Sequence, residues 1–211
     1  MFVRVAEPSL EAVREADSRL LIRSGYDSIQ RPYNEILDEI AEIPDLEGVV
    51  LIHQDMELTD ASLLERLRPL LREPRVGVVG LLGGRGVPPH AWWEAEELFG
   101  TSRTPLVEQR HSHGPHEVEV VDGALLALAP WVVRELRFDE ALSADFHGYD
   151  VDLCLGVRAA GGRVICDDIP YIHHMSRPWA DGEQYARAGR ILSRRWGRDL
   201  DPRERIPSWS L

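Results

Sequence analysis

The order of helical and strand patterns along the chain limits its fold more than any other sequence feature. The clearest helix carries its apolar residues on one face, at Tyr33, Ile36, Leu37, Ile40 and Ala41. The uninterrupted apolar run at 48–52 is typical of a strand that is covered on both faces. A helix over 60–71 and a strand over 76–82 repeat this order. Such alternation with short loops predicts a three-layer α/β sandwich on a mostly parallel sheet.

The rest of the chain shows neither an internal repeat nor a linker, so we expect a single domain over residues 1–211. Further helices are expected at 8–16, 130–136, 150–160 and 181–196, and further strands at 20–22, 118–129, 163–166 and 171–174. Residues 83–117, rich in glycine, proline and histidine, predict a long irregular loop. Residues 178–211 predict a C-terminal helix and tail.

The charge of the chain excludes partners that are bound mainly through a basic surface. The formal net charge is −12, and all 24 basic residues are arginines, because the sequence contains no lysine. Nucleic acids and anionic membranes are polyanions, so we expect neither as a partner. An anionic small molecule would need a metal ion or a local group of arginines to bind.

Cysteine content and hydropathy indicate the compartment. Cys154 and Cys166 are too few for a disulfide framework and predict two reduced, buried thiols. Residues 1–16 lack the apolar run of a signal peptide, and no segment is long and apolar enough for a transmembrane span. We therefore expect a soluble, cytoplasmic protein.

Acidic residues and histidines fall at predicted strand ends, where open α/β sheets place their sites. His53, Gln54 and Asp55 follow the strongest strand, and their oxygen and imidazole groups are suitable ligands for Mg²⁺ or Mn²⁺. A polar cluster that simply ends the strand explains these residues equally well. His173 or His174 could complete a metal shell begun by Asp55. Because neighbours on a strand face opposite ways, we expect one of the two to point into a cleft.

A second candidate lies at the start of the helix at 150, where Tyr149 precedes the acidic residues Asp150 and Asp152. Capping and the helix dipole favour acidic residues in a first turn without any catalytic role. The functional alternative is a carboxylate at the cleft that acts as a general base toward an acceptor hydroxyl.

Weaker signals come from the segment 83–117. Trp92 and Trp93 could stack on a sugar ring or pin the loop to the core. The glycine-rich stretch around Arg85 lacks the ending of a phosphate-binding loop, although the guanidinium could still contact a diphosphate. Three histidines have no matching pair of ligands elsewhere and do not predict a zinc site: His111, His113 and His116.

In combination, these motifs resemble those of family-two glycosyltransferases of the GT-A fold, and they are most similar to a bacterial branch whose metal motif reads His-Gln-Asp. The resemblance covers residues 27–174 and rests on Tyr33-Asn34, Val50 to Asp55, Val120 to Ala124, Leu136 to Glu140, His147 to Cys154 and His173-His174. It implies a Rossmann-like GT-A sandwich. The first strand of that fold is expected to be shortened or missing in this chain.

The resemblance also implies a role for each motif. Asp55 would bind the Mn²⁺ or Mg²⁺ that bridges the donor diphosphate, and His53 would contact the donor's ribose or phosphate. Asp150 would be the general base, and His173 or His174 would add a metal or phosphate contact. Arg85 would contact the donor diphosphate, and residues 83–117 would form a loop on the acceptor side. The sugar and acceptor pocket would be lined by Trp92, Trp93, Asp122, Gly123, Tyr149 and Asp152.

The implied reaction is inverting, metal-dependent transfer of a sugar from a nucleotide diphosphate sugar to a hydroxyl group. The acceptor would be a glycan, a lipid-linked molecule or a small molecule. Two other functions stay open, namely a glycosyltransferase-like module that binds a sugar or a partner without turnover, and a metal-dependent hydrolase that uses the histidines and carboxylates. Assembly into a homo-oligomer also stays open.

Overall fold

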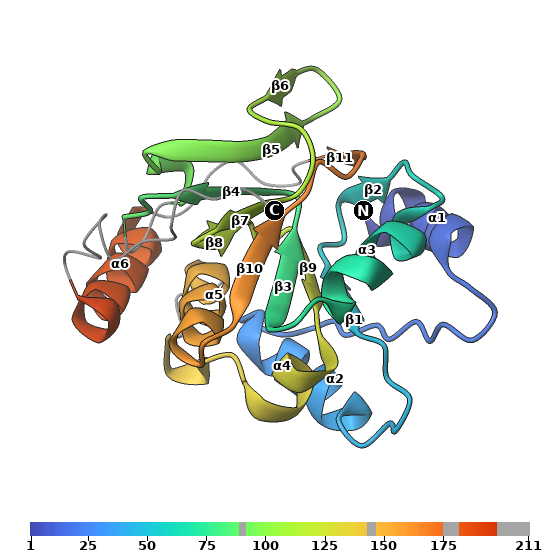
Figure 1. Cartoon of the computed structure of the whole chain (residues 1–211), viewed down its shortest axis with the longest axis horizontal. Helices are drawn as coiled ribbons and strands as arrows, with labels where there is room; N and C mark the ends of the chain where they lie inside the picture. Colours follow the sequence, from blue (N-terminus) through green and yellow to red (C-terminus); the bar gives the residue numbers. More distant parts are fainter. Residues whose placement is uncertain (89–91, 143–146, 175–181, 198–211) are drawn as a thin grey trace.

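A five-stranded sheet forms the centre of the computed structural model, which describes residues 1–88, 92–142, 147–174 and 182–197 (Figure 1). Its strands lie in the order β1 (Val49–Ile52), β9 (Leu125–Leu128), β3 (Val76–Gly80), β10 (Arg163–Cys166) and β7 (His116–Val118). β1 therefore lies at one edge of the sheet and pairs within it only with β9.

This sheet is mixed, which corrects the prediction of a mostly parallel one. β3 and β10 pair in parallel, whereas β9 pairs antiparallel with both β1 and β3, and β7 pairs antiparallel with β10. β1 and β3 thus run in the same direction on either side of β9. Hydrophobic periodicity shows how a strand is buried but not its direction, so the sequence could not reveal that β9 is reversed.

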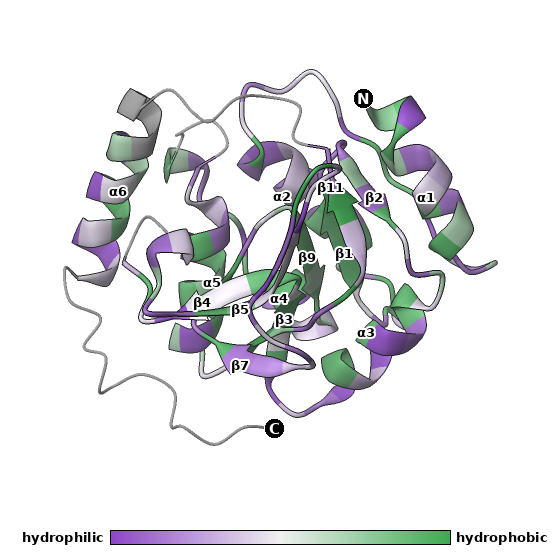
Figure 2. Cartoon of the chain, turned by 90° about the horizontal axis from the view of Figure 1, so that it is seen from above, coloured by the Kyte–Doolittle hydropathy of each residue, from purple (hydrophilic) through white to green (hydrophobic). Residues whose placement is uncertain are grey.

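Helices cover both faces of the sheet, which confirms the expected α/β class and its three layers. One face carries three helices: α2 (Gln30–Ile40), α4 (Pro130–Glu135) and α5 (Tyr149–Ala159). The other face carries α3 (Leu63–Arg72). Alternation along β10 serves both cores, because Val164 and Cys166 pack with α5 while Ile165 packs with the α3 side. Figure 2 shows the hydrophobic residues concentrated on the central strands.

The segment before β1 contains no strand, in agreement with the expected shortening or loss of the first strand. Residues 1–48 form a short 3₁₀ turn (Phe2–Arg4), α1 (Ala6–Val13) and α2. The predicted strand at 20–22 is wrong, because this stretch has no strand partner and remains irregular. Its leucines instead face the edge of β1 that does not pair with β9, and Leu21 packs against the core.

A second, antiparallel sheet includes three parts of the segment 83–117, which was predicted to be an irregular loop throughout. Its order is β6 (Glu108–Arg110), β5 (Glu97–Arg103), β4 (Leu82–Arg85) and β8 (Val120–Val121), and a 3₁₀ turn covers Trp92–Glu94. Glycines make this packing feasible. A Cβ on Gly83 would lie 2.3 Å from the carbonyl oxygen of Val120, and one on Gly84 would lie 2.4 Å from the Cβ of Ala95. Glycine thus removes the apolar alternation by which such strands are usually predicted.

Two smaller corrections concern the strands that carry the candidate site. The predicted strand at 118–129 is interrupted at 119 and at 122–124, so it forms the end of β7, then β8 and then β9. The sequence did not indicate β2 (Met56–Leu58), which pairs antiparallel with β11 (Tyr171–His173).

The C-terminal helix, α6 (Gly182–Trp196), matches its prediction, while residues 178–181 and 198–211 of the predicted helix and tail lie outside the described part. Across the described residues, we find no helix with the length and apolar character needed to cross a bilayer.

Candidate functional site

The candidate site lies where β1 ends beside the turn that leads into β9. Since these strands are antiparallel, the end of one meets the start of the other, and the backbone N–H of His53 donates to the carbonyl of Ala124 at 3.0 Å. The pairing of β2 with β11 brings His173 opposite Met56, directly after Asp55. Four separate segments of the chain therefore converge here: 53–55, 122–124, 149–150 and 173.

His53, Asp55 and His173 form a group that could hold a metal ion. One candidate ligand atom from each lies within 4.8 Å of the others, and Asp55 is buried. Nε2 of His173 lies 3.4 Å from Oδ1 of Asp55. No second group of this kind occurs among the residues that the structure describes.

The two adjacent histidines separate as expected for a strand. His173 faces Asp55, whereas Nε2 of His174 lies 2.7 Å from Oε2 of Glu57. The backbone N–H of His174 still donates to the carbonyl of Asp55 at 2.9 Å. His173 is therefore the candidate ligand, and the predicted alternative, His174, belongs to a different pair.

The donor set of this cluster fits a divalent cation. Burial lowers the pKa of His53 despite the opposing charges of Asp122 and Asp55, which favours the neutral imidazole that metals bind. Burial also lowers the pKa of His173, but the hydrogen bond to Asp55 and the charges of Asp122 and Asp55 outweigh it and raise that pKa. Two imidazoles with one carboxylate favour a first-row transition ion over Mg²⁺, which prefers oxygen ligands.

Tyr149 connects the cluster to the start of α5. Its hydroxyl lies 2.7 Å from Nε2 of His53, and its ring is buried. Burial, followed by nearby negative charges, raises its pKa well above the ordinary value, so the hydroxyl keeps its proton. Gly123 gives this ring its space, because a Cβ at that position would lie 2.1 Å from the Tyr149 hydroxyl oxygen.

Asp150 is a buried carboxylate held by two backbone amides. Oδ2 accepts from the N–H of Gly123 at 3.1 Å, and Oδ1 accepts from its neighbour Val151 at 2.9 Å. Burial and the charge of Asp122 raise the pKa of Asp150 to about 7. Asp122 accepts from the N–H of Ala124 at 2.8 Å. An acid that is about half ionised near neutral pH can both accept and return a proton.

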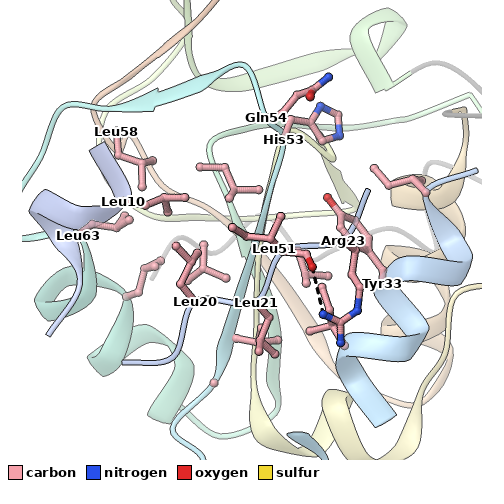
Figure 3. Close-up of a pocket in the computed structure, with 18 of the residues that line it drawn as sticks. Leu10, Leu20, Leu21, Arg23, Tyr33, Leu51, His53, Gln54, Leu58 and Leu63 are labelled. Carbon is pink, nitrogen blue, oxygen red and sulfur yellow. Dashed lines mark hydrogen bonds between the residues drawn. The ribbon is translucent and has the colours of Figure 1, made fainter. Parts of the chain in front are cut away.

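A cavity of about 1220 Å³ joins these groups. Its walls include His53, Asp55, Asp122, Tyr149, Asp150 and His173, as well as Trp92 and Trp93. The two tryptophan rings meet edge to face, with centroids 5.6 Å apart. Figure 3 shows His53 and Gln54 at one end of this cavity.

Besides His174 and Gly123, two more predicted site residues do not line this cavity, namely Arg85 and Asp152. The guanidinium of Arg85 donates to the carbonyl of Glu117 at 2.8 Å and stacks over Phe99, 4.7 Å from the ring centroid. It also pairs with Glu97 at 3.6 Å. Arg85 therefore stabilises the second sheet and does not line the cavity.

The carboxylate of Asp152 likewise faces away from the cavity. Both of its oxygens accept from Nη1 of Arg195, at 2.8 and 2.7 Å, and Oδ1 accepts from Nε1 of Trp196 at 2.8 Å. Asp152 therefore joins α5 to the C-terminal helix, which corrects its predicted place in the acceptor pocket.

Two other residues of the cavity wall were not predicted as site residues. Tyr33 is buried, and its hydroxyl has no hydrogen-bond partner within the described residues. Arg103 donates to the carbonyl of Ile169 at 3.1 Å and pairs with Asp168 at 3.2 Å, next to β11. Tyr33 belongs to the Tyr33-Asn34 motif, which gave a signal for this position, whereas no sequence motif indicates Arg103.

Comparisons with known proteins show what this chain is similar to. A family model described as "Glycosyltransferase like family" matches residues 14–188. The chain is 31% identical over 212 residues to the streptomycin biosynthesis protein StrF of Streptomyces griseus, covering 98% of this chain and 74% of that protein. The crystal structure of A197 from STIV aligns with a TM-score of 0.49 and 10% identity, over 82% of this chain and 90% of that one.

Proposed function

Because the chain belongs to the glycosyltransferase-like family, we propose that it transfers a sugar from a nucleotide diphosphate sugar to an acceptor hydroxyl, with inversion at the anomeric carbon. One observation carries the proposal. A candidate metal cluster and a buried carboxylate with a pKa of about 7 line the same cavity. Transfer needs both, since the leaving diphosphate requires positive charge and the attacking hydroxyl requires a base.

Asp150 is the proposed general base. Its carboxylate is already oriented by the amides of Gly123 and Val151, so little reorganisation is needed when it takes the acceptor proton. The base acts in direct displacement, in which the acceptor oxygen attacks the anomeric carbon as the diphosphate leaves. Asp122 supports this role, because its charge contributes to the raised pKa of Asp150.

His53, Asp55 and His173 are the proposed ligands of a divalent cation, with Mn²⁺ fitting the donor set better than Mg²⁺. When bound, such an ion offsets the negative charge of the diphosphate. The tyrosine hydroxyl at His53 is the kind of neighbour that fixes a ligating imidazole. This arrangement would let a protein of net charge −12 bind an anionic donor.

Trp92 and Trp93 are the proposed stacking surface for a sugar ring, because aromatic faces in a cleft suit the apolar face of a sugar. Asp122, in the cavity wall, would lie beside that sugar, and Gly123 has the indirect role of leaving space for the ring of Tyr149. Arg85 and Asp152 have no part in this proposal, since each is committed to partners outside the cavity.

A non-catalytic sugar-binding module is the second candidate. The observation that favours it is the absence of a strand in residues 1–48, because the resemblance implies that the first strand of the GT-A fold contributes to the site for the nucleotide base. Turnover distinguishes the two functions, because a binding module would hold the same ligands without consuming them.

The decisive experiment combines binding with turnover on the full chain. Thermal shift and calorimetry with a panel of nucleoside diphosphates should show stabilisation that depends on Mn²⁺. Hydrolysis or transfer from the matching nucleotide sugar should fall by at least about a hundredfold in Asp150→Asn. Asp38→Asn, on an exposed carboxylate of α2, is the matched control. Binding without turnover in the wild type would favour the module, and neither binding nor turnover would overturn both.

A further inference from the structure

The hairpin formed by β5 and β6 presents an apolar tip and an open strand edge to solvent. In Figure 1 this hairpin projects from the top of the molecule. At its turn, Leu106 and Val107 are 93% and 62% exposed. β6 is exposed along its whole length, and among the described residues it pairs with β5 alone. The proposed chemistry uses neither feature, and an open edge is a surface on which another strand can pair.

Hydrogen bonds and ion pairs hold this hairpin in one shape. The N–H of Thr104 donates to the carbonyl of Val107 at 2.8 Å, and Oγ1 of Thr104 accepts from the N–H of Val107 at 3.1 Å. At the base of the hairpin, Arg103 pairs with Glu108 at 3.3 Å and with Asp168 at 3.2 Å. Since the hairpin is already ordered, a partner that binds it loses little free energy in ordering it.

The register of the hairpin determines which backbone groups of β6 face outward. In an antiparallel pair, opposite residues alternate between those that exchange backbone hydrogen bonds and those that do not. On the β6 side, residues 107 and 111 both bond toward the β5 side. By this alternation residue 109 also bonds inward, opposite residue 102. The N–H and C=O groups of Glu108 and Arg110 therefore point away from β5, toward the open edge.

The charges of β6 suit a second copy of the same strand. Two antiparallel copies pair about a twofold axis, and their outward-facing residues must lie opposite each other. With Gln109 on the axis, Glu108 of each copy lies opposite Arg110 of the other copy, and both pairs exchange backbone hydrogen bonds. An axis at position 108 or 110 would instead place two glutamates or two arginines opposite each other. Charges on an edge strand usually prevent pairing, but here they select one register.

We propose that two copies of this protein pair through β6 and join their four-stranded sheets into one continuous sheet. The same register brings the apolar tip, Leu106 and Val107, against residues 111–112 of the other copy. This dimer does not depend on the proposed function, because no residue of the candidate metal cluster and no candidate base takes part in it. Since only a few residues of each copy pair, we expect a weak dimer with a Kd on the order of 10–100 µM.

Charge reversal on β6 tests the dimer directly. Sedimentation equilibrium of the full chain, at concentrations from about 1 to about 500 µM, measures the Kd. Glu108→Arg and Arg110→Glu each place like charges opposite each other twice in the symmetric dimer, so each should raise the Kd by at least about tenfold. Glu65→Arg, the same change on the exposed surface of α3, is the matched control and should leave the Kd unchanged. A protein that stays monomeric throughout this range, or a dimer whose Kd neither reversal changes, would overturn the proposal.

Recombining the charges separates direct pairing from damage to the hairpin. Glu108→Arg also loses the ion pair with Arg103, so a weaker dimer in this variant alone does not distinguish the two causes. An equal mixture of Glu108→Arg and Arg110→Glu should form a mixed dimer with about the wild-type Kd, because the arginines of one copy then lie opposite the glutamates of the other. The double variant Glu108→Arg/Arg110→Glu should recover the dimer for the same reason. No recovery in either case would overturn the proposal.

Two further measurements on the same protein test the register. Amide hydrogen exchange at Glu108 and Arg110 should slow as the protein concentration rises, whereas exchange at Gln109 should not change, because its N–H already faces β5. Leu106→Asn should raise the Kd by several-fold, because the dimer buries the tip of each copy. Exchange that does not depend on concentration at 108 and 110, or an unchanged Kd in Leu106→Asn, would overturn this register and with it the proposed pairing.

Discussion

Nε2 of His53 and the hydroxyl of Tyr149 lie 2.7 Å apart and join the end of β1 to the start of α5. Through this contact, a candidate metal ligand is held by the residue that directly precedes the candidate base, Asp150. The proposed metal and base functions are therefore linked by one hydrogen bond between residues 96 positions apart.

Tyr149→Phe should weaken the binding of Mn²⁺ while the protein stays folded. The hydroxyl orients the ring of His53, and loss of such a partner typically costs about 10–100-fold in metal affinity. The free energy of unfolding should fall by only about 1 kcal/mol, because one hydrogen bond is lost from a ring that stays packed. Calorimetric titration with Mn²⁺ measures the first effect, and denaturant unfolding measures the second.

Tyr26→Phe is the matched control, since it removes a hydroxyl that bonds Glu35 on α2, away from the metal cluster. Its Mn²⁺ affinity should equal that of the wild type. An unchanged affinity in Tyr149→Phe would show that the hydroxyl does not support a metal site.

His173→Ala and His174→Ala should separate two neighbours that the sequence alone could not distinguish. His173 faces Asp55, and His174 pairs with Glu57. We expect Mn²⁺ affinity to fall by at least about a hundredfold in His173→Ala, which loses one of three candidate ligands, and by less than about threefold in His174→Ala. The ranking of the two affinities, measured by titration, decides the assignment. A reversed ranking would mean that His174 is the ligand.

The sequence predicted the parts of the site that depend on the end of an element, and it failed where a side chain depends on a distant partner. His53 and Asp55 follow an apolar strand, so their arrival at a sheet end could be predicted. Asp150 and Asp152 are the same residue type in the first turn of the same helix, so the sequence does not distinguish them. However, residues two apart on a helix point about 200° away from each other, so they reach different surroundings. The partner of Asp152 is Arg195, 43 positions away, which no local pattern indicates.

The same dependence on distant partners explains which parts of the fold could not be predicted from the sequence. The short apolar run at 163–166 predicted β10, and the 3.6-residue period predicted α2 and α3, because each pattern depends only on neighbours in sequence. The second sheet was missed because its strands contain glycines where side chains would collide, as at Gly83 and Gly84. The reversal of β9 depends on which strands it lies between, and this is a property of the assembled sheet.

The stability of the protein should depend on pH through Asp150. Burial raises its folded-state pKa from an ordinary value of 3.8 to about 7. Between these values the folded form holds a proton that the unfolded form has lost, so the free energy of unfolding falls as pH rises from about 4 to about 7. Asp150→Asn cannot titrate and should not show this loss. Urea unfolding at a series of pH values, in the absence of metal, measures the free energy of unfolding of both proteins. The value for the variant should increase relative to the wild type up to about pH 7, and the difference should be constant above that pH.

Asp38→Asn serves as the comparison for that series, because it makes the same chemical change on the exposed surface of α2. A difference between Asp150→Asn and wild type that stays constant from pH 4 to pH 7 would contradict the raised pKa. It would also remove the main physical reason for assigning proton transfer to this carboxylate.

Arg195→Gln should loosen the attachment of the C-terminal helix to α5. Arg195 donates to both oxygens of Asp152 and also pairs with Asp139. Asp152 is 8% exposed, so loss of the guanidinium leaves a nearly buried carboxylate with only the Trp196 indole as a side-chain donor in the described structure. Since Arg195 itself is 38% exposed, we expect a loss of about 1–2 kcal/mol in the free energy of unfolding, below the value for a fully buried pair.

Arg194→Gln, one residue earlier and exposed, is the matched control, and its free energy of unfolding should stay within about 0.5 kcal/mol of wild type. In a double-mutant cycle with Asp152→Asn, the two changes should be clearly less than additive, and additivity would show that the pair does not stabilise the helix.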